Sequence, residues 1–395
     1  MLERGTSRPL TATCARGLEE VLAAEVAALG ASAVAPGRGS VAFSGDLRTV
    51  YDANLRLRTA MRVLAPAVRG EVRSRDDLYE LAASAPWSEI IEPGQTFAVE
   101  VVGRHQAFRN TTFAGQVVKD AIVDRLRTQR GKRPDVERED PDVRLHLRLT
   151  ERGPTTLSLD SSGEPLSHRG YRPHGGGPAP LAESLAAGIL LLAGYDGSQP
   201  LLDPLCGSGT FTAEAALIAT RTPPGLRRAF AFERWRLHDR QLFEEVHHQA
   251  SRGHRDAPAP IVARDRDERA VRATARNLKA AWMDRWVQVE RRDVLDLQLP
   301  WGEGGMIVAN PPYGKRLGEV KKLGGFYRRL GDALKQHATG ATAWVLVGEP
   351  QLAKQIGLKT ARKIPLFNGP IECRLLKFEL YEGSQKHHDV QTLER

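Results

Sequence analysis

The residues best suited to chemistry form the segment Asn310-Pro311-Pro312-Tyr313, which follows a short apolar strand expected at 306–309. Its two prolines fix φ and remove two backbone donors, so the side-chain oxygen of Asn310 and the carbonyl of Pro311 can face the same way on a rigid arm. Two adjacent acceptors match the two hydrogens of an exocyclic amine and would free its lone pair for attack on a sulfonium methyl group. Tyr313 offers a stacking face for an extruded base. The segment therefore predicts activation of a base amine.

A second segment with chemical potential lies between an apolar strand at 201–202 and a helix expected at 210–219. Gly207 and Gly209 permit a tight turn and the close approach of a ligand, but the third glycine of a dinucleotide fingerprint is replaced by Thr212. The preceding acidic residue would repel a phosphate and suits the amino group of S-adenosylmethionine. We expect this cofactor to be bound by loop residues Asp203, Pro204, Cys206, Gly207, Ser208, Gly209 and Thr210.

Two further aspartates follow the next expected strands in order. Asp265, after a strand at 261–263, can accept hydrogen bonds from ribose hydroxyls, and Asp293, after a strand at 287–290, can accept from an adenine amino group. A doubly wound sheet binds ligands outside its strands' carboxyl ends, so we expect both aspartates, with Asn310, to contact the cofactor. Asp267 can do the same or can cap the helix expected at 267–280, and the sequence leaves both options open.

Strand and helix alternate from residue 201 to residue 347, which predicts a parallel sheet covered by helices on both faces. The expected helices of this part also include one at 325–337, and a further strand is expected at 343–347. Asn368-Gly369 between apolar runs predicts that the last two strands form an antiparallel hairpin. The fold expected for this half is therefore Rossmann-like, with a seven-stranded mixed sheet.

The first half reads as two smaller α/β units. Residues 10–65 predict a helix at 18–29, a strand at 41–43 and a second helix at 47–62. Residues 66–165 predict a helix capped by Asp76, a strand at 96–102, a long helix around 113–126 and strands at 143–149 and 155–159. A segment rich in Gly and Pro, 168–180, separates this half from the second.

The net charge of +9 and the isoelectric point near 9.6 favour a polyanionic partner. Residues before position 165 include 23 basic and 23 acidic side chains, whereas the remainder include 34 and 25. Two basic stretches, 221–255 and 315–335, and the polar face of the strand at 143–149 are candidate RNA surfaces, although each can equally be a solvated face. The residues we expect to bind RNA are Arg227, Arg228, Lys315, Arg316, Arg144 and Arg148.

Several classes of protein are excluded. The most apolar stretch without charge, 185–193, has nine residues, about half of a membrane span, and the N-terminus has no apolar signal core. Cys14, Cys206 and Cys373 lie far apart, so we expect neither disulfides nor a cysteine zinc site, and the histidine pairs lack partners at metal spacing. We expect a soluble, cytoplasmic and monomeric protein that binds no metal.

The two chemical segments resemble the first and fourth motifs of class I amino-group methyltransferases. More narrowly, they resemble those of the THUMP-containing bacterial 23S rRNA guanine-N2 methyltransferases and their tRNA relatives. The resemblance extends over nearly the whole chain, through Thr13-Cys14-Ala15-Arg16-Gly17-Leu18-Glu19, His168-Arg169-Gly170-Tyr171-Arg172 and the segment 224–235. That last segment lies in an insertion that stretches Asp203 to Asp265 to 62 residues, far beyond a simple βαβ unit.

This resemblance implies a domain order: a ferredoxin-like domain at 1–65, a THUMP domain at 66–165, a linker at 166–180, a methyltransferase domain at 181–383 and a flexible tail at 384–395. It implies S-adenosylmethionine as cofactor and N2-methylguanosine in 23S rRNA as product. The second methyltransferase domain of some relatives is expected to be absent, which leaves a tRNA substrate open. The chain could also be a DNA adenine-N6 methyltransferase, which the THUMP-like half disfavours, or a non-catalytic RNA-binding assembly factor, which the intact motifs disfavour.

Overall fold

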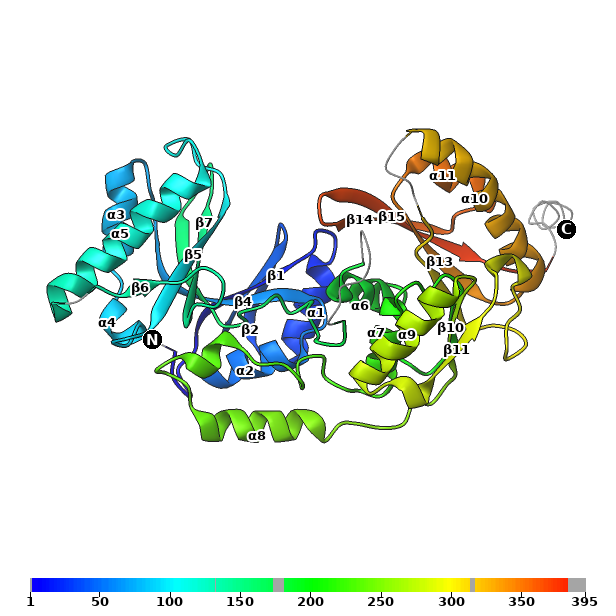
Figure 1. Ribbon diagram of the computed structural model, residues 1–395, viewed down its shortest axis with the longest axis horizontal. Coiled ribbons are helices and arrows are strands. Elements are labelled where there is room, and N and C mark those ends of the chain that lie inside the picture. Colours follow the sequence, from blue (N-terminus) through cyan, green and yellow to red (C-terminus); the bar gives the residue numbers. More distant parts are fainter. Residues whose placement is uncertain (1, 132, 173–180, 313–316, 383–395) are drawn as a thin grey trace, which may run out of the picture. The chain divides into compact units, whose positions relative to one another are not determined.

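The computed structural model describes residues 2–131, 133–172, 181–312 and 317–382. The chain divides into two compact units (Figure 1). Unit 1 comprises Met1–Arg169 and Pro223–Gly253, and unit 2 comprises Gly170–Thr222 and His254–Arg395. Within the described part of the chain, no helix combines the length and the apolar character that a membrane span needs.

Unit 1 is built on an eight-stranded mixed sheet with the order β2-β3-β1-β4-β8-β7-β5-β6. Most neighbouring strands pair antiparallel, while β5 runs parallel to β7 and β6. The strands are β1 Arg8–Cys14, β2 Ser32–Gly37, β3 Ser40–Gly45, β4 Ala60–Gly70, β5 Thr96–Gly103, β6 Asp135–Val136, β7 Val143–Leu149 and β8 Thr155–Asp160. The sheet is continuous because β4 pairs with both β1 and β8, which joins the two predicted N-terminal units through one strand.

The helices of unit 1 are α1 Glu19–Ala28, α2 Leu47–Arg56, α3 Arg75–Ala83, α4 Trp87–Ile90, α5 Thr111–Arg130, the 3-10 helix η1 Ala231–Arg234 and α8 Arg240–Ser251. The helix predicted at 47–62 is too long, because the carboxylate of Glu25 accepts the backbone N–H groups of Arg58 and Thr59 and the chain then enters β4. The predicted cap is also wrong, since Ser74 and not Asp76 caps α3.

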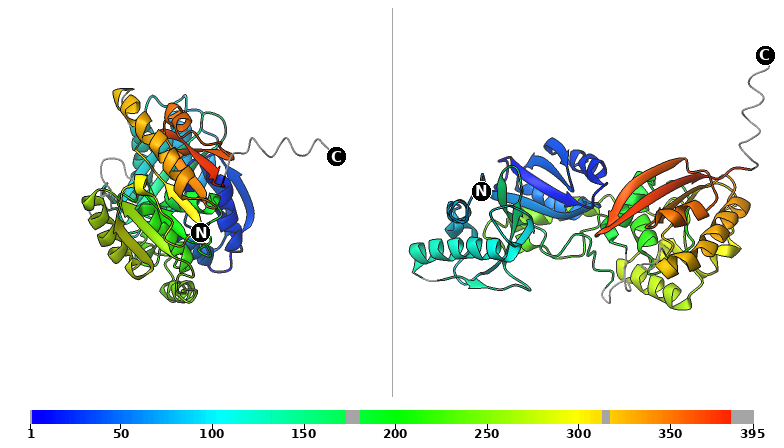
Figure 2. Two further views of the ribbon diagram at one scale, coloured as in Figure 1. Left: turned by 90° about the vertical axis from the view of Figure 1, so that its right-hand side faces the viewer. Right: turned by 90° about the horizontal axis from the view of Figure 1, so that it is seen from above.

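Unit 2 contains the predicted seven-stranded mixed sheet, with the order β11-β10-β9-β12-β13-β15-β14. Figures 1 and 2 show this unit, with its last two strands at the red end of the colour bar. The first five strands in this order are parallel, β15 runs antiparallel to β13, and β14 and β15 form the predicted hairpin. The strands are β9 Leu201–Asp203, β10 Ile261–Asp265, β11 Val287–Arg291, β12 Met306–Ala309, β13 Thr342–Val347, β14 Arg362–Asn368 and β15 Ile371–Glu379. After β9 the chain adds β10 and β11 on one side of that strand, and then returns to add β12 and β13 on its other side. Sheets of this type bind ligands at the point where the strand order switches in this way.

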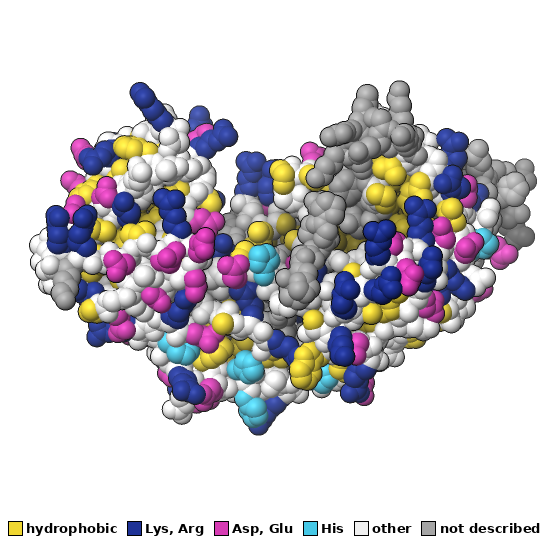
Figure 3. All heavy atoms as spheres, in the orientation of Figure 1, with side chains coloured by type: hydrophobic (Ala, Val, Ile, Leu, Met, Phe, Trp, Pro, Cys, Tyr) yellow, Lys and Arg dark blue, Asp and Glu magenta, His cyan; other side chains and the backbone are white. Residues whose placement is uncertain are grey.

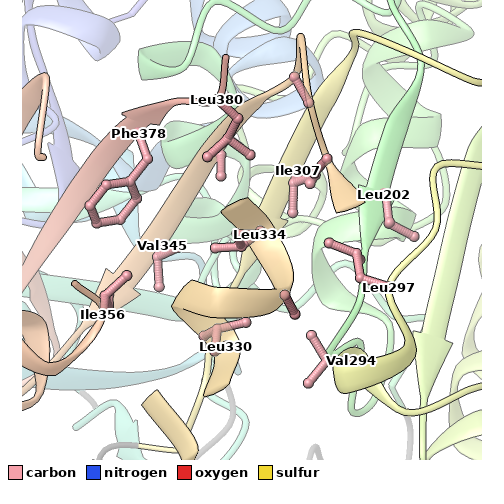
Figure 4. Close-up of a cluster of buried hydrophobic side chains, with 14 of the residues drawn as sticks. Leu202, Val294, Leu297, Ile307, Leu330, Leu334, Val345, Ile356, Phe378 and Leu380 are labelled. Atoms are coloured by element: carbon pink, nitrogen blue, oxygen red, sulfur yellow. The ribbon is translucent and has the colours of Figure 1, made fainter. Parts of the chain in front are cut away.

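Helices cover both faces of this sheet: α6 Glu183–Leu192, α7 Thr210–Ala219, α9 Glu268–Ala281, η2 Asp284–Trp286, η3 Val294–Asp296, α10 Leu317–His337 and α11 Pro350–Gln355. A cluster of buried side chains joins one face to α10 (Figure 4). In it, Leu330 and Leu334 of α10 pack against strand residues Leu202, Ile307 and Val345. This packing fixes the ends of β9 and β12, which carry the two chemical segments.

The insertion is the main departure from the predicted domain order. The resemblance implies that residues 181–383 form one methyltransferase domain, but Pro223–Gly253 belongs to unit 1. The ring of Tyr51 on α2 lies 4.6 Å from that of Phe232 and 5.4 Å from that of Phe243, and its hydroxyl accepts from the backbone N–H of Asp239 at 2.9 Å. The aromatic residues of the insertion therefore pack against α2 in the N-terminal half.

Candidate active site

The loop between β9 and α7 has the tight geometry that its glycines permit. Gly207 and Gly209 adopt φ values of +55° and +81°, and the N–H of Gly209 donates to the carbonyl of Cys206 at 2.7 Å. A Cβ added at Gly209 would lie 2.7 Å from the methyl carbon of Thr274, whereas one added at Gly207 meets no described atom within 4 Å. The loop is thus closely packed on one side and open at Gly207, as a cofactor cradle requires.

Two residues of α9 hold this loop, and the sequence does not reveal them. The hydroxyl of Thr274 donates to the carbonyl of Gly207 at 3.0 Å, and one turn later the side-chain amide of Asn277 donates to the carbonyl of Ser208 at 2.8 Å. A trans peptide points its N–H opposite to its carbonyl, so the N–H of Ser208 faces away from α9. Spacing of three residues on a helix is the only local signal, and it is too common to identify them.

The predicted carboxylates are brought together at this loop. Asp203 is buried and accepts from the N–H of Leu205 at 3.1 Å, while Asp265 accepts from the N–H of Gly207 at 3.0 Å. Burial raises the pKa of Asp203 to about 8, and the negative charge of Asp265 adds to the rise. A cationic group bound beside Asp203 would reverse this effect, because an opposite charge favours the ionised carboxylate. Burial also raises the pKa of the Cys206 thiol, which keeps it protonated.

Asp267 and Asp293 both cap helices. Asp267 is the N-cap of α9 and accepts from the N–H of Arg269 at 2.9 Å, so the cap that the sequence offers as one option is present. Asp293 accepts from the N–H of Leu295 at 3.0 Å and starts η3. Only one of its carboxylate oxygens is the acceptor in that bond, and its position after β11 is the predicted one.

Asn310 lies at the end of β12 with its side-chain oxygen buried and without a hydrogen-bond partner among the described residues. A buried acceptor without a partner costs free energy, so it indicates a position reserved for a ligand donor. The following arm is held from behind, because the hydroxyl of the fully buried Tyr327 donates to the carbonyl of Pro312 at 3.2 Å. Tyr313, Lys315 and Arg316, which the sequence assigns to base stacking and RNA contact, lie outside the described residues.

The predicted RNA contacts separate into different groups. The guanidinium of Arg228 donates to the carbonyls of Ser162, Glu164, Pro165 and His168, so it holds the insertion to the rest of unit 1. Arg227 is exposed beside it. On β7, Arg148 is exposed, whereas Arg144 is half-buried and donates to the carbonyl of Glu139 at 3.2 Å.

The predicted linker contributes to both units. Leu166 is buried in unit 1, and Arg172 pairs with Glu183 and donates to the hydroxyl of Thr210, the first residue of α7, at 3.3 Å. Arg172 therefore supports the end of the cofactor loop. Residues 173–180 of the linker, like the tail at 384–395, lie outside the described part of the chain.

Because the insertion belongs to unit 1, the excess of basic residues is shared between the two units, whereas the division of the sequence at residue 165 places all of it in the second part. Unit 1 contains 30 basic and 27 acidic residues, and unit 2 contains 27 and 21. In Figure 3, basic side chains gather where α9 of unit 2 lies, and its exposed residues include Arg269, Arg272, Arg276 and Lys279. The outer face of the helix that holds the cofactor loop is therefore basic.

Family models match three consecutive parts of the chain. The model described as the RlmL ferredoxin-like domain matches residues 9–64, the THUMP domain matches 72–160, and the methyltransferase domain described as RMKL-like matches 169–377. The predicted resemblance and fold class are thus confirmed.

Individual relatives agree with these models. A ribosomal RNA large subunit methyltransferase K/L from Cellvibrio japonicus is 42% identical over 93% of this chain, and the chain spans about half, 51%, of that relative's length. A putative RNA methyltransferase from Synechocystis sp. is 39% identical over 95% of this chain and 98% of its own. The crystal structure of SMU.472, a putative methyltransferase complexed with SAH, superposes with a TM-score of 0.85 at 27% identity and covers 96% of this chain and 99% of its own. The chain belongs to the RMKL-like methyltransferase family, with ferredoxin-like and THUMP domains preceding the methyltransferase domain.

Proposed function

We propose that this RNA methyltransferase transfers the methyl group of S-adenosylmethionine to the exocyclic N2 amine of a guanosine in 23S rRNA. The observation that carries the proposal is the buried, unpartnered side-chain oxygen of Asn310 among the described residues, at the carboxyl end of β12. It lies in a sheet whose adjacent strand β9 ends at the cofactor loop, so acceptor and cofactor residues share one edge. The Cellvibrio japonicus relative, named as a methyltransferase of large-subunit rRNA, supports the substrate class.

The chain's residues fit the cofactor. The opening at Gly207, the N–H of Ser208 turned away from α9 and the carboxylates of Asp203 and Asp265 offer space, a donor and acceptors around one loop. When bound, S-adenosylmethionine supplies an electrophilic methyl group on its sulfonium. We assign Asp203 to the cationic amino group, Asp265 to ribose hydroxyls and Asp293 to the adenine amine, as the order of strand ends indicates.

The base amine is activated by acceptors of this chain. Asn310 Oδ1 and the carbonyl of Pro311 accept the two hydrogens of the amine and draw its lone pair out of conjugation with the ring. The new N–C bond forms as the S–C bond breaks, and one proton leaves the nitrogen for solvent. Tyr313 stacks on the extruded base in this proposal.

One experiment tests the substrate, the atom and the class of RNA. The protein is incubated with methyl-labelled S-adenosylmethionine and total RNA from a strain that lacks the gene, and the modified nucleoside is mapped by mass spectrometry in separated rRNA and tRNA. We expect N2-methylguanosine in 23S rRNA. The same nucleoside in tRNA alone would identify tRNA as the substrate, and absence of any labelled RNA would overturn the proposal. If the Asn310→Ala variant labels RNA at the wild-type rate, Asn310 does not activate the base amine.

A further inference from the structure

Unit 1 carries a groove in which Arg148, one of the residues predicted to bind RNA, lies with two arginines that the sequence analysis does not name. The groove has a volume of about 600 Å³ and lies on its eight-stranded sheet, where β1, β2, β3, β4, β7 and β8 contribute residues. Three arginines line it: Arg69 of β4, Arg148 of β7 and Arg152 of the turn between β7 and β8. The hydroxyl-bearing residues Thr11, Ser44, Thr150 and Thr156 also line it, and none of its lining residues is acidic.

The register of the sheet places these charges in a row. Arg69 and Arg148 are both paired with Thr156 of β8, one from each side. Strands two positions apart place Cα atoms about 10 Å apart, so the two guanidinium groups lie over one stretch of sheet. All three arginines are exposed, and within the described residues none has a hydrogen bond or an ion pair at its side chain. Like charges gathered in this way repel one another, so sheet stability does not explain them.

A neighbouring arginine on the same strand shows the contrast. Arg62 of β4 forms ion pairs with Asp160 of β8 and with Glu100 of β5, and the pair with Glu100 has an N–O distance of 3.2 Å. Arg62 is thus neutralised by the sheet itself. The groove arginines, a few residues along the same sheet, have no acid in the groove lining, and an anionic partner is the charge that would balance them.

We propose that this groove binds the phosphates of a single-stranded segment of the RNA substrate. The proposal rests on the proposed function, since it takes RNA as the partner. A positively charged groove that follows a backbone is typical of single-strand binding. The only aromatic residue of the lining, Phe43, is buried, so the groove offers charge and hydroxyls but no stacking face. We therefore infer that it fixes the position of the RNA and does not read its bases.

The test compares two triple variants with equal loss of charge. The groove variant combines Arg69→Gln, Arg148→Gln and Arg152→Gln. The control combines Arg38→Gln, Arg109→Gln and Arg125→Gln, which are exposed residues of unit 1 outside the groove lining. Fluorescence anisotropy with labelled poly(U) and with a 23S rRNA transcript gives affinity over a series of salt concentrations. Methyl transfer to the transcript gives KM and kcat, and melting curves check folding.

We expect the groove variant to bind both RNAs about tenfold more weakly. Each contact with a phosphate of a single strand contributes roughly 0.7 to the slope of log affinity against log salt, so the loss of three contacts should lower the magnitude of this slope by about 2. KM for RNA should rise while kcat at saturating RNA is kept, and the control should stay within about twofold of wild type. If both variants weaken RNA binding equally, or if the groove variant binds RNA like wild type, the proposal that the groove binds RNA is wrong. A wild-type protein that neither binds nor methylates RNA would instead refute the proposed function.

Discussion

The two sheets of this protein carry their polar residues in different ways. Unit 2 gathers them at an edge, where Asp203 and Asp265 end parallel strands and Asn310 follows another. Unit 1 carries Arg69 and Arg148 on a face, in the middle of a row across mostly antiparallel strands. The residues at this edge belong to loops, where neighbours in space are also neighbours in the sequence and include Gly, Pro and Asp. The residues of a sheet face are every second residue of several strands that lie far apart in the sequence. The edge is therefore visible in the sequence, whereas of the face only the contribution of a single strand, with Arg148, can be predicted.

The same comparison shows that an arginine's surroundings decide its role. The sequence predicts the same role for Arg228 and Arg148, but Arg228 is occupied by four backbone carbonyls and Arg148 is exposed in a groove without acids. Burial lowers the pKa of Arg228 to about 10, with the positive charge of Arg169 as a further cause. The basic composition of a segment does not distinguish these two outcomes.

The largest effect is expected for Asn310→Ala, which should separate catalysis at the edge of unit 2 from RNA binding on the face of unit 1. We expect kcat to fall by about 10²–10³, because a preorganised polar partner of the reacting group is lost. The affinity for RNA and for S-adenosylhomocysteine should change by less than about twofold, since the RNA groove and the cofactor loop are untouched. Single-turnover methyl transfer and calorimetry measure these quantities. Tyr327→Phe, which removes the hydrogen bond to the carbonyl of Pro312, serves as a milder variant. A parallel loss of RNA affinity in Asn310→Ala would break the comparison.

Arg228→Gln tests whether the insertion is held to unit 1 as the structure shows. We expect the free energy of unfolding to fall by about 2–4 kcal/mol, because several backbone carbonyls lose a charged donor at once. Urea denaturation measures the change. The exposed neighbour provides the matched control, and Arg227→Gln should cost less than about 1 kcal/mol. If Arg228→Gln keeps full stability and instead lowers the salt slope of RNA binding, Arg228 is an RNA contact after all.

A third prediction, for the edge, is a pH dependence of stability. The pKa of Asp203 rises from 3.8 to about 8 on folding, so between these values the folded protein holds a proton that the unfolded chain has lost. The contribution of Asp203 to stability is therefore present below about pH 4 and is lost as pH rises toward about 8. Melting temperatures of wild type should decline over this range relative to Asp203→Asn, which keeps the acceptor for Leu205.

Adding S-adenosylhomocysteine sharpens that measurement, because its cationic amino group should lower the pKa of Asp203 and flatten the wild-type curve. Curves for wild type and Asp203→Asn that stay parallel from about pH 5 to about pH 8 would show that Asp203 is ionised in the folded protein.

The edge and the fold of unit 2 are largely predictable, because strands buried on both faces are apolar runs and their loops contain Gly, Pro and Asp at fixed places. Thr274 and Asn277 are not, since their partners are backbone carbonyls about seventy residues earlier in the chain. The second helix is predicted too long for a similar reason. Only the tertiary contact with Glu25 ends it before β4.

The sequence by itself determined the alternation of strands and helices, the seven-stranded sheet with its terminal hairpin, and the order of Asp203, Asp265 and Asn310 on successive strand ends. These features depend on local patterns of burial and on the few residues that tolerate tight turns. The tertiary structure alone decided that Pro223–Gly253 joins unit 1, that Arg228 is satisfied by carbonyls and that Arg69, Arg148 and Arg152 share one groove. The reason is that a charge is neutralised, or left for a ligand, by whatever lies opposite it in space, and position along the chain does not specify that neighbour.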